Sequence, residues 1–323
     1  MFTISSAFCP KTYNYTLQCV WNLYVEPPST EPPSTEPPST EPPSTEPPST
    51  EPPLTEPPLT SLRAVATGVI DEMLSKAGEY AIEKANIYTV QNYTDLIFER
   101  NPNVWCAEMD FTGCSPWNSH DGPRRAGTLV TPRHVLFSTH YGIPINSTII
   151  FVTSANEVIS RTVIATTIAH NDISVGMLDS DVPSSIKHYK VLPTDYRKYA
   201  TPGVPVIEFT QRETALLAIY EGTTISTYDY GLVYFSCYGI PFNPAQQLWY
   251  NTIIIGDSGN PTFFYIDGEE ILASLFYYPF AGVSVGIHAD KINEAISRLG
   301  STYTVEQKSL SAYYVFQTVF NDA

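Results

Sequence analysis

The serine in "IIIGDSGNPTFF", residues 253–264, is the first residue of this chain whose surroundings suggest chemistry. Gly256 and Gly259 flank Asp257 and Ser258 between two apolar runs, where a buried strand would ordinarily turn back. A tight turn is one explanation for the glycines. The other is a serine on a bent loop, because glycine lets the backbone come close to a bound group.

A serine hydroxyl is a poor nucleophile near neutral pH and needs a histidine base that a carboxylate orients. His140 follows an apolar run in "HVLFSTHY", so we expect its ring to project from the end of a strand. Asp172 opens the apolar strand "DISVGML", where its carboxylate should lie half-buried and hold one imidazole tautomer. We therefore predict His140, Asp172 and Ser258 as the catalytic residues, in that chain order.

The other candidates for these roles have less suitable surroundings. Asp179 and Asp181 lie in "LDSDVP", a turn signature, and we expect them to be solvated. We expect structural roles for the remaining histidines, which are His120, His134, His170, His188 and His288.

Short strands separated by Gly, Pro and Asn must position these residues. The 22 Tyr and 15 Phe favour strands over helices. Ten or more strands at this spacing predict an all-β barrel or sandwich. We expect strands near residues 127–130, 134–138, 148–153, 158–166, 172–178, 204–209, 214–220, 231–237, 261–266 and 270–277, and then a helix in "HADKINEAISRLG" that ends at Gly300.

The chain divides into five expected segments. Residues 1–25 form a short head, and residues 26–60 repeat a five-residue unit, EPPST or EPPLT, seven times. The prolines and the mutually repelling glutamates predict an extended spacer, disordered in the sense of lacking a packed core. It is either a plain spacer or a ligand for a proline-recognising partner or surface.

Residues 61–100 read as a helical connector to the domain that follows. Leu62, Val65, Val69 and Met73 recur at steps of three and four, which predicts an amphipathic helix over 61–85. Packing on the domain is one role for this helix, and a cleavable inhibitory segment is the other. Residues 101–300 are the main domain, and the β-prone residues 301–323 form an extension that could add an edge strand.

Charge and composition exclude some functions. The net charge is −16, of which the seven repeat glutamates contribute 7, and an acidic chain repels nucleic-acid backbones. No run of 18 apolar residues occurs, so we expect no transmembrane helix. The N-terminus does not resemble an ordinary signal peptide. The sequence leaves the localisation unassigned.

The five cysteines are an odd number without metal-ligand spacing, so we expect no metal and no cofactor. Cys106 with Cys114 and Cys9 with Cys19 are possible disulfides that would leave Cys237 free, and a fully reduced set is equally possible.

The segments "TLVTPRHVLFSTHY", "NDISVGML" and "GDSGNP", in this order, resemble the three catalytic blocks of trypsin/chymotrypsin-like serine proteases. The similarity covers roughly residues 104 to 300, and its spacing resembles the short bacterial and viral members. It implies two six-stranded antiparallel β-barrels of chymotrypsin type and cleavage of a protein or peptide substrate. It also implies that Ser258 is the nucleophile, His140 the base and Asp172 its orienting partner, with the N–H groups of Gly256 and Ser258 as the oxyanion hole.

The chain departs from this family in three places. "STHY" lacks the cysteine that usually follows the catalytic histidine, and Asn260 replaces the second glycine of Gly-Gly-Pro. No Ile-Val-Gly-Gly-type start follows a basic residue, so we do not expect a new N-terminus to insert beside Asp257. We expect Asp257 to pair with an arginine or with backbone instead.

Substrate-binding residues follow from the same resemblance. Thr252, six residues before Ser258, takes the position at the base of the specificity pocket, and the walls should come from the strand around Ser274 and from the segment near 283–286. Because Thr252 is uncharged, we expect a neutral or apolar side chain before the scissile bond.

The sequence offers two alternatives to an active peptidase. The first is a catalytically inactive, protease-like binding or structural module that the proline-rich segment displays. The second, an esterase of the α/β-hydrolase class, does not fit, because that class needs Gly-X-Ser-X-Gly and the chain order Ser, Asp, His.

Overall fold

The computed structural model describes residues 59–117, 126–225, 233–278 and 281–316. All of them belong to one unit of the chain, Glu56–Ala323. The predicted head and all but the last two residues of the predicted spacer lie outside the described residues.

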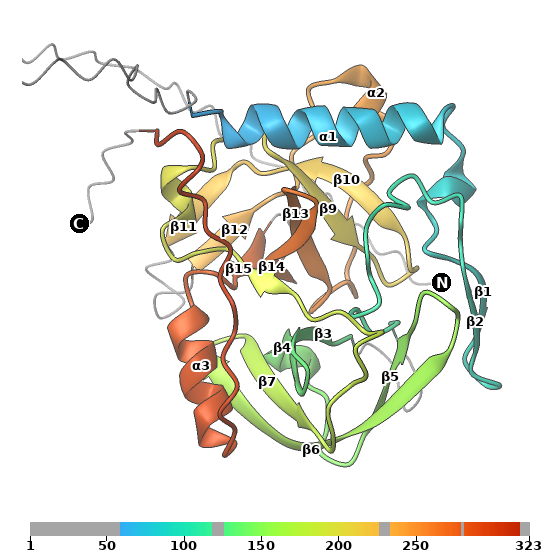
Figure 1. Ribbon diagram of the computed structural model, residues 1–323, viewed down its shortest axis with the longest axis vertical. Helices are drawn as coiled ribbons and strands as arrows, with labels where there is room; N and C mark the ends of the chain where they lie inside the picture. Colours follow the sequence, from blue (N-terminus) through green and yellow to red (C-terminus); the bar gives the residue numbers. More distant parts are fainter. Residues whose placement is uncertain (1–58, 118–125, 226–232, 279–280, 317–323) are drawn as a thin grey trace, which may run out of the picture. The chain divides into compact units, whose positions relative to one another are not determined.

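Five antiparallel strands form the first half-barrel (Figure 1). They are β3 (Thr128–Thr131), β4 (His134–Ser138), β5 (Thr148–Val152), β6 (Val158–His170) and β7 (Ile173–Leu178). Their order in the sheet is β3-β4-β7-β6-β5. Alternate apolar side chains such as Val135, Phe137 and Val163 meet in a separate core on the inner face.

Seven antiparallel strands form the second half-barrel, in the order β10-β9-β13-β14-β15-β12-β11. They are β9 (Pro205–Phe209), β10 (Ala215–Ile219), β11 (Gly222–Ile225), β12 (Val233–Ser236), β13 (Pro261–Ile266), β14 (Glu269–Tyr278) and β15 (Ala281–Ser284). The two-residue strand β8 (Lys190–Val191) pairs in parallel with β14. Phe235, Phe264 and Ala273 lie in the core of this half-barrel.

The all-β prediction is confirmed, with two antiparallel half-barrels of five and seven strands in place of six strands each. Each of the ten expected strands is present within a few residues of its expected bounds. The sequence pattern missed β8, β11, β15 and a hairpin of β1 (Tyr88–Asn92) and β2 (Ile97–Arg100). β11 and β15 are four-residue strands with small residues and no apolar alternation, so no period-2 signal marks them.

The N-terminal helix α1 (Leu62–Ala77) lies across β9 and β13 of the second half-barrel (Figure 1). Its buried face contains Leu62, Ile70 and Met73. The helix is shorter than the expected 61–85 because Gly78, with a φ of 72°, ends it and donates its N–H to the Leu74 carbonyl at 3.1 Å. A 3₁₀ helix, Ile82–Ala85, follows.

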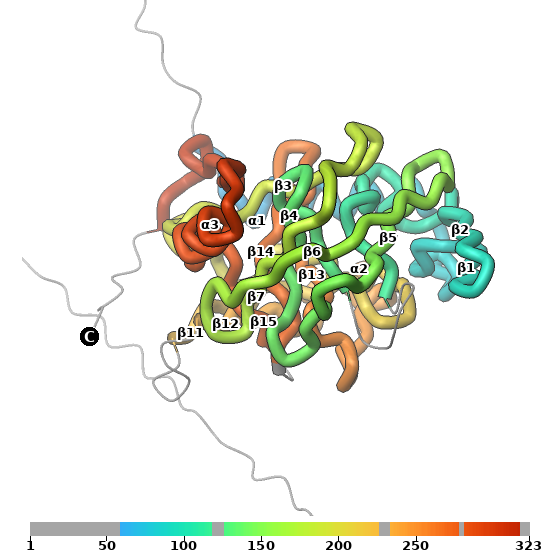
Figure 2. The backbone as a smooth tube through the Cα atoms, turned by 90° about the horizontal axis from the view of Figure 1, so that it is seen from below, coloured from blue at the N-terminus to red at the C-terminus, as the bar shows by residue number. Residues whose placement is uncertain are grey.

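The helix α3 (Ala289–Arg298) packs against β6 and β7 of the first half-barrel, and the segment after it turns back along the molecule (Figures 1 and 2). This segment forms isolated bridges, Gln307 with Val191 and Tyr313 with Thr60, and no strand within residues 301–316. The expected edge strand is therefore absent from these residues.

A third apolar core lies between the two half-barrels and joins them to the N-terminal segment. It contains Leu136 from β4, Phe263 from β13 and Ile70 from α1. Trp105 fills the same core and donates its indole N–H to the Ala215 carbonyl at 2.9 Å. The half-barrels are thus held in a fixed relation by residues that precede both of them.

The described cysteines, Cys106, Cys114 and Cys237, are free thiols. The possible Cys106–Cys114 disulfide is therefore not formed, and Cys9 and Cys19 lie outside the described residues. No helix in the described part of the chain has the length and apolar character that crossing a membrane requires.

Candidate active site

His140 and Asp172 meet because β4 and β7 are antiparallel neighbours. Ser138 at the end of β4 pairs with Ile173 at the start of β7, so the residues just beyond these strands share one edge of the sheet. The Nδ1 atom of His140 lies 2.8 Å from each carboxylate oxygen of Asp172. The His140 backbone N–H donates to Oδ1 of Asp172 at 2.9 Å. Both the ring and the backbone of His140 are therefore oriented by one carboxylate.

Two hydroxyl groups complete the support of this pair, and sequence reasoning missed both. Ser138 donates its hydroxyl to Oδ2 of Asp172, and its Oγ lies 2.7 Å from Nδ1 of His140. Thr139 Oγ1 donates to the Asn171 carbonyl at 3.0 Å and lies 2.8 Å from Ser174 Oγ. The turn between β4 and His140 is thus fastened to the start of β7 at several points.

The His140–Asp172 pair is buried at the aspartate and exposed to solvent at the histidine. The Asp172 side chain is 9 % exposed, whereas the His140 side chain is 39 % exposed. The rings of Tyr141 and Tyr277 lie with their centroids 4.7 and 5.6 Å from that of His140. With Nδ1 directed to the carboxylate, Nε2 is the nitrogen of His140 that remains for proton transfer.

The loop that carries Ser258 belongs to the second half-barrel and reaches the first at Gly259. The Gly259 N–H donates to the Phe276 carbonyl of β14 at 2.9 Å, and the φ of Gly259 is 87°. A Cβ atom at Gly259 would lie 3.2 Å from the backbone nitrogen of Ser138. The Ser258 loop therefore lies against the end of β4, two residues from His140.

Ser258 itself is 6 % exposed. Within the described residues no hydrogen bond joins Ser258 to His140. Hydrogen bonds between catalytic groups are often long or poorly aligned before substrate binds, and they tighten in the substrate complex. The structure thus joins His140 to Asp172 directly and brings the Ser258 loop beside them.

Asp257 is fully buried and is held by backbone. Its Oδ1 accepts the Gln211 N–H at 2.7 Å, and its Oδ2 accepts the Ile254 N–H at 2.8 Å. Burial raises the pKa of Asp257, and these two donors and the charge of Arg212 lower it in part. Of the two partners left open by the sequence, backbone is the one found.

Two N–H groups of the loop stay available to an incoming acceptor. Among the residues that the structure describes, none accepts a hydrogen bond from the backbone N–H of Gly256 or Ser258. Gly256 has a φ of 111°, a conformation that residues with side chains rarely adopt. Buried N–H groups without an acceptor are uncommon, which makes this pair a candidate anion site.

The two expected substrate-binding residues have different environments. Thr252 is exposed in the loop before the nucleophile and donates its N–H to Oδ1 of Asn251 at 2.8 Å. Ser274 is fully buried in β14, where a Cβ atom at Gly282 would lie 2.5 Å from its Oγ. Ser274 therefore lies inside the half-barrel, with no exposed surface, whereas Thr252 is solvent-accessible.

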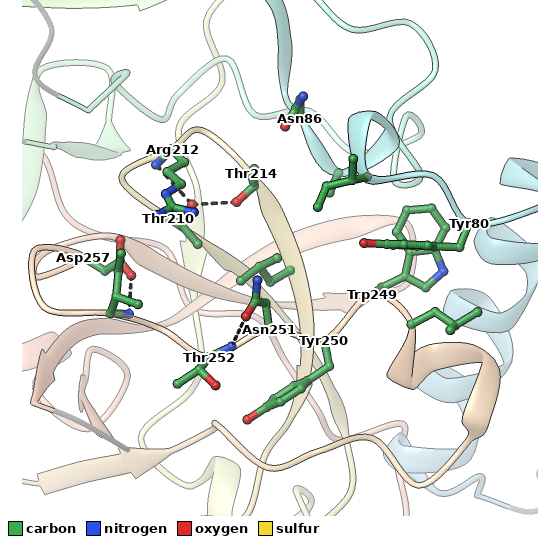
Figure 3. Close-up of a pocket in the computed structure, with 15 residues that line it drawn as sticks. Tyr80, Asn86, Thr210, Arg212, Thr214, Trp249, Tyr250, Asn251, Thr252 and Asp257 are labelled. Carbon is green, nitrogen blue, oxygen red and sulfur yellow. Dashed lines mark hydrogen bonds between the residues drawn. The ribbon is translucent and has the colours of Figure 1, made fainter.

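Thr252 and Asp257 line a pocket of about 280 Å³ (Figure 3). One wall comes from the segment after α1, where the rings of Tyr80 and Trp249 meet edge to face at 5.0 Å. Another wall is the turn of the β9–β10 hairpin, with Arg212. The N-terminal segment and the hairpin thus enclose the loop that leads to Ser258.

The sequence did not single out two buried acidic residues. One lies in a strand and the other in a turn, and no motif marks either of them. Glu213 accepts the backbone N–H of Trp117, and burial raises the pKa of Glu213 to about 8. Glu208 is buried on β9 beside the Cys237 thiol, and burial raises the pKa of Glu208 well above its ordinary value.

Within the described residues no group of three or more His, Cys, Asp and Glu side chains is arranged to hold a metal ion. Comparison with models of known protein families and with curated proteins gives no match.

Proposed function

We propose that this chain is a serine endopeptidase of the trypsin/chymotrypsin-like type, with His140, Asp172 and Ser258 as its catalytic residues. The observation that carries the proposal is the His140–Asp172 pair, with Nδ1 2.8 Å from the carboxylate, at the point where the Ser258 loop lies against β4. We assign the two half-barrels to the chymotrypsin type on the same grounds. Protein or peptide substrates follow from this assignment.

Proton transfer in this mechanism runs through Nε2 of His140. The Ser258 hydroxyl attacks the peptide carbonyl carbon and passes its proton to Nε2 as the C–O bond forms. The carboxylate of Asp172 stabilises the positive imidazolium. His140 then gives the proton to the leaving amine as the C–N bond breaks, which leaves an acyl group on Ser258. Water activated by His140 removes that group and regenerates the serine.

The backbone N–H groups of Gly256 and Ser258 are the proposed oxyanion hole. The negative charge that develops on the carbonyl oxygen needs donors that are already oriented, and each such donor is worth on the order of 3 kcal/mol. Both N–H groups lack an acceptor among the described residues, which supports this role.

The specificity proposal follows from Thr252. A residue without charge at the pocket base gives no ion pair to a lysine or arginine side chain, so a neutral or apolar side chain before the scissile bond is expected. Cleavage of a peptide library by the full-length protein tests this preference directly.

Covalent labelling of the full-length protein with a fluorophosphonate tests the mechanism, because this reagent reacts with activated serines. The wild-type protein should be labelled, and both Ser258→Ala and His140→Ala should lose the label. Ser160→Ala removes an exposed serine of β6 and should keep the label. Absence of label on the folded wild-type protein would leave the displayed binding module as the function to pursue.

A further inference from the structure

The peptide between Ile255 and Gly256 has a defined orientation in this structure. The side-chain Nε2 of Gln211 donates to the Ile255 carbonyl at 3.1 Å. In a trans peptide the C=O and the following N–H point in opposite directions. The Gly256 N–H therefore points away from Gln211.

Gln211 contacts this loop twice. Besides its side-chain bond to Ile255, its backbone N–H donates to Oδ1 of Asp257 at 2.7 Å. Its side chain also covers Gly256 so closely that a Cβ atom there would lie 2.6 Å from Nε2. One residue at the turn of the β9–β10 hairpin thus holds the residues on both sides of Gly256.

A turn hydrogen bond from the Asp257 N–H to the Ile254 carbonyl at 3.1 Å spans this peptide, but turns closed by this bond occur with the central peptide in either orientation. Ile255 is 85 % exposed, so packing of its side chain does not hold the peptide. Residues 251–256 form no strand or helix, and Gly256 tolerates backbone conformations on both sides of the φ map. Rotation of this peptide would exchange the positions of the Ile255 carbonyl and the Gly256 N–H. A carbonyl oxygen would then face the substrate at the point where the oxyanion needs a donor.

We propose that Gln211 is a positioning residue that keeps the Ile255–Gly256 peptide in the orientation that offers the Gly256 N–H to the substrate oxygen. This inference rests on the proposed peptidase function. It also means that the folded chain supplies the group that orders the nucleophile loop, so proteolytic release of a new N-terminus is not needed for that purpose.

The test compares Gln211→Glu with Gln247→Glu in the full-length protein. Gln211→Glu keeps the size of the side chain and the backbone N–H to Asp257, but it replaces the Nε2 donor by a carboxylate that repels the Ile255 carbonyl. Gln247 is a matched control because its Nε2 donates to the Pro241 carbonyl at 2.9 Å, outside the site. Thermal melting of both variants checks that each one folds.

Gln211→Glu should lower kcat and the rate of fluorophosphonate labelling by about 10²-fold, the effect of losing one oxyanion donor, with a much smaller change in KM. A peptide aldehyde forms an adduct that places an oxyanion in the same position. It should therefore bind more weakly to Gln211→Glu than to the wild-type protein, by a similar factor. Gln247→Glu should match the wild-type protein in each assay. Unchanged labelling of folded Gln211→Glu would overturn the inference and leave the proposed function intact.

A second readout separates the two proposals. With ¹³C-labelled isoleucine, the Ile255 carbonyl resonance should move in Gln211→Glu and stay in place in Gln247→Glu, because only the first variant loses the hydrogen bond. If the wild-type protein takes no label, the peptidase function fails, and this resonance still decides whether Gln211 holds the peptide. If the Ile255 carbonyl resonance does not move in Gln211→Glu, the positioning role of Gln211 is rejected.

Discussion

Gly259 lies directly against Ser138, and this contact joins the Ser258 loop of one half-barrel to the end of β4 in the other. A Cβ atom at Gly259 would come within 3.2 Å of the Ser138 backbone nitrogen and 3.3 Å of its Cβ. The nearest atom belongs to the backbone and cannot rotate away. The relation between Ser258 and His140 therefore depends on a glycine at this position.

Gly259→Ala should separate the loop from β4 and lower fluorophosphonate labelling by at least about tenfold, because a 1 Å misplacement of catalytic groups can cost up to about 10²-fold. Gly268→Ala is the matched control, since Gly268 has a similar φ of 77° and nothing within 4 Å of an added Cβ. In both variants the alanine must adopt a left-handed backbone conformation, which costs about 1–2 kcal/mol. Only Gly259→Ala also places a Cβ atom against Ser138. Equal labelling rates after correction for folded fraction would contradict this prediction.

Ser138→Ala should lower kcat/KM by about 10- to 100-fold, because a hydrogen bond to a charged group contributes roughly 1.5–3 kcal/mol. The variant removes the donor to Oδ2 of Asp172 and the Oγ contact with Nδ1 of His140, and it leaves the His140–Asp172 contacts in place. Ser174→Ala, which removes a buried hydroxyl that contacts Thr139 and not the carboxylate, is the control. Steady-state kinetics across pH measure the effect, and equal losses in both variants would argue for a merely structural role.

Glu213 should make the protein less stable as the pH rises. Its pKa of about 8 in the folded protein lies above the ordinary value near 4.3, so the folded state holds the proton where the unfolded state has released it. Its contribution to the free energy of unfolding should fall between about pH 4.5 and pH 8, by up to about 1.4 kcal/mol per pH unit, and level off above.

Glu213→Gln removes this titration and keeps an acceptor for the Trp117 N–H. Denaturant unfolding at several pH values should show the variant gaining stability over the wild-type protein as the pH rises. Glu221→Gln, a change at an exposed carboxylate, should follow the wild-type curve. If the free energies of unfolding of Glu213→Gln and of the wild-type protein change with pH in parallel, the raised pKa of Glu213 is wrong.

Helix α1 should be needed for stability. Met73 is 2 % exposed and belongs to the core between the half-barrels, so Met73→Ala should lower the free energy of unfolding by about 2–5 kcal/mol. Ser75→Ala on the exposed face of the same helix should change it by less than about 0.5 kcal/mol. Chemical denaturation measures both variants. A negligible effect of Met73→Ala would favour the alternative in which this segment is removable.

The apolar pattern of the chain was enough to predict ten of the strands and to single out the three blocks in which we propose the catalytic residues. Short apolar runs such as "HVLFS" and "DISVGML" predicted β4 and β7, which are almost fully buried strands. The same runs indicated that His140 and Asp172 follow and precede strands. Their hydrogen-bonded contact is consistent with this local signal, since antiparallel neighbours bring such ends together.

The residues that support these blocks can be identified only in the folded protein. Gln211 and Glu213 stand in an ordinary hairpin turn, and Ser138 ends a strand, so no local pattern sets them apart. Their partners, Ile255, Trp117 and Asp172, are 34 to 96 residues away along the chain. Apolar pattern and propensity report on neighbours within a strand or turn, whereas these contacts depend on which strands and loops, distant along the chain, the fold places side by side.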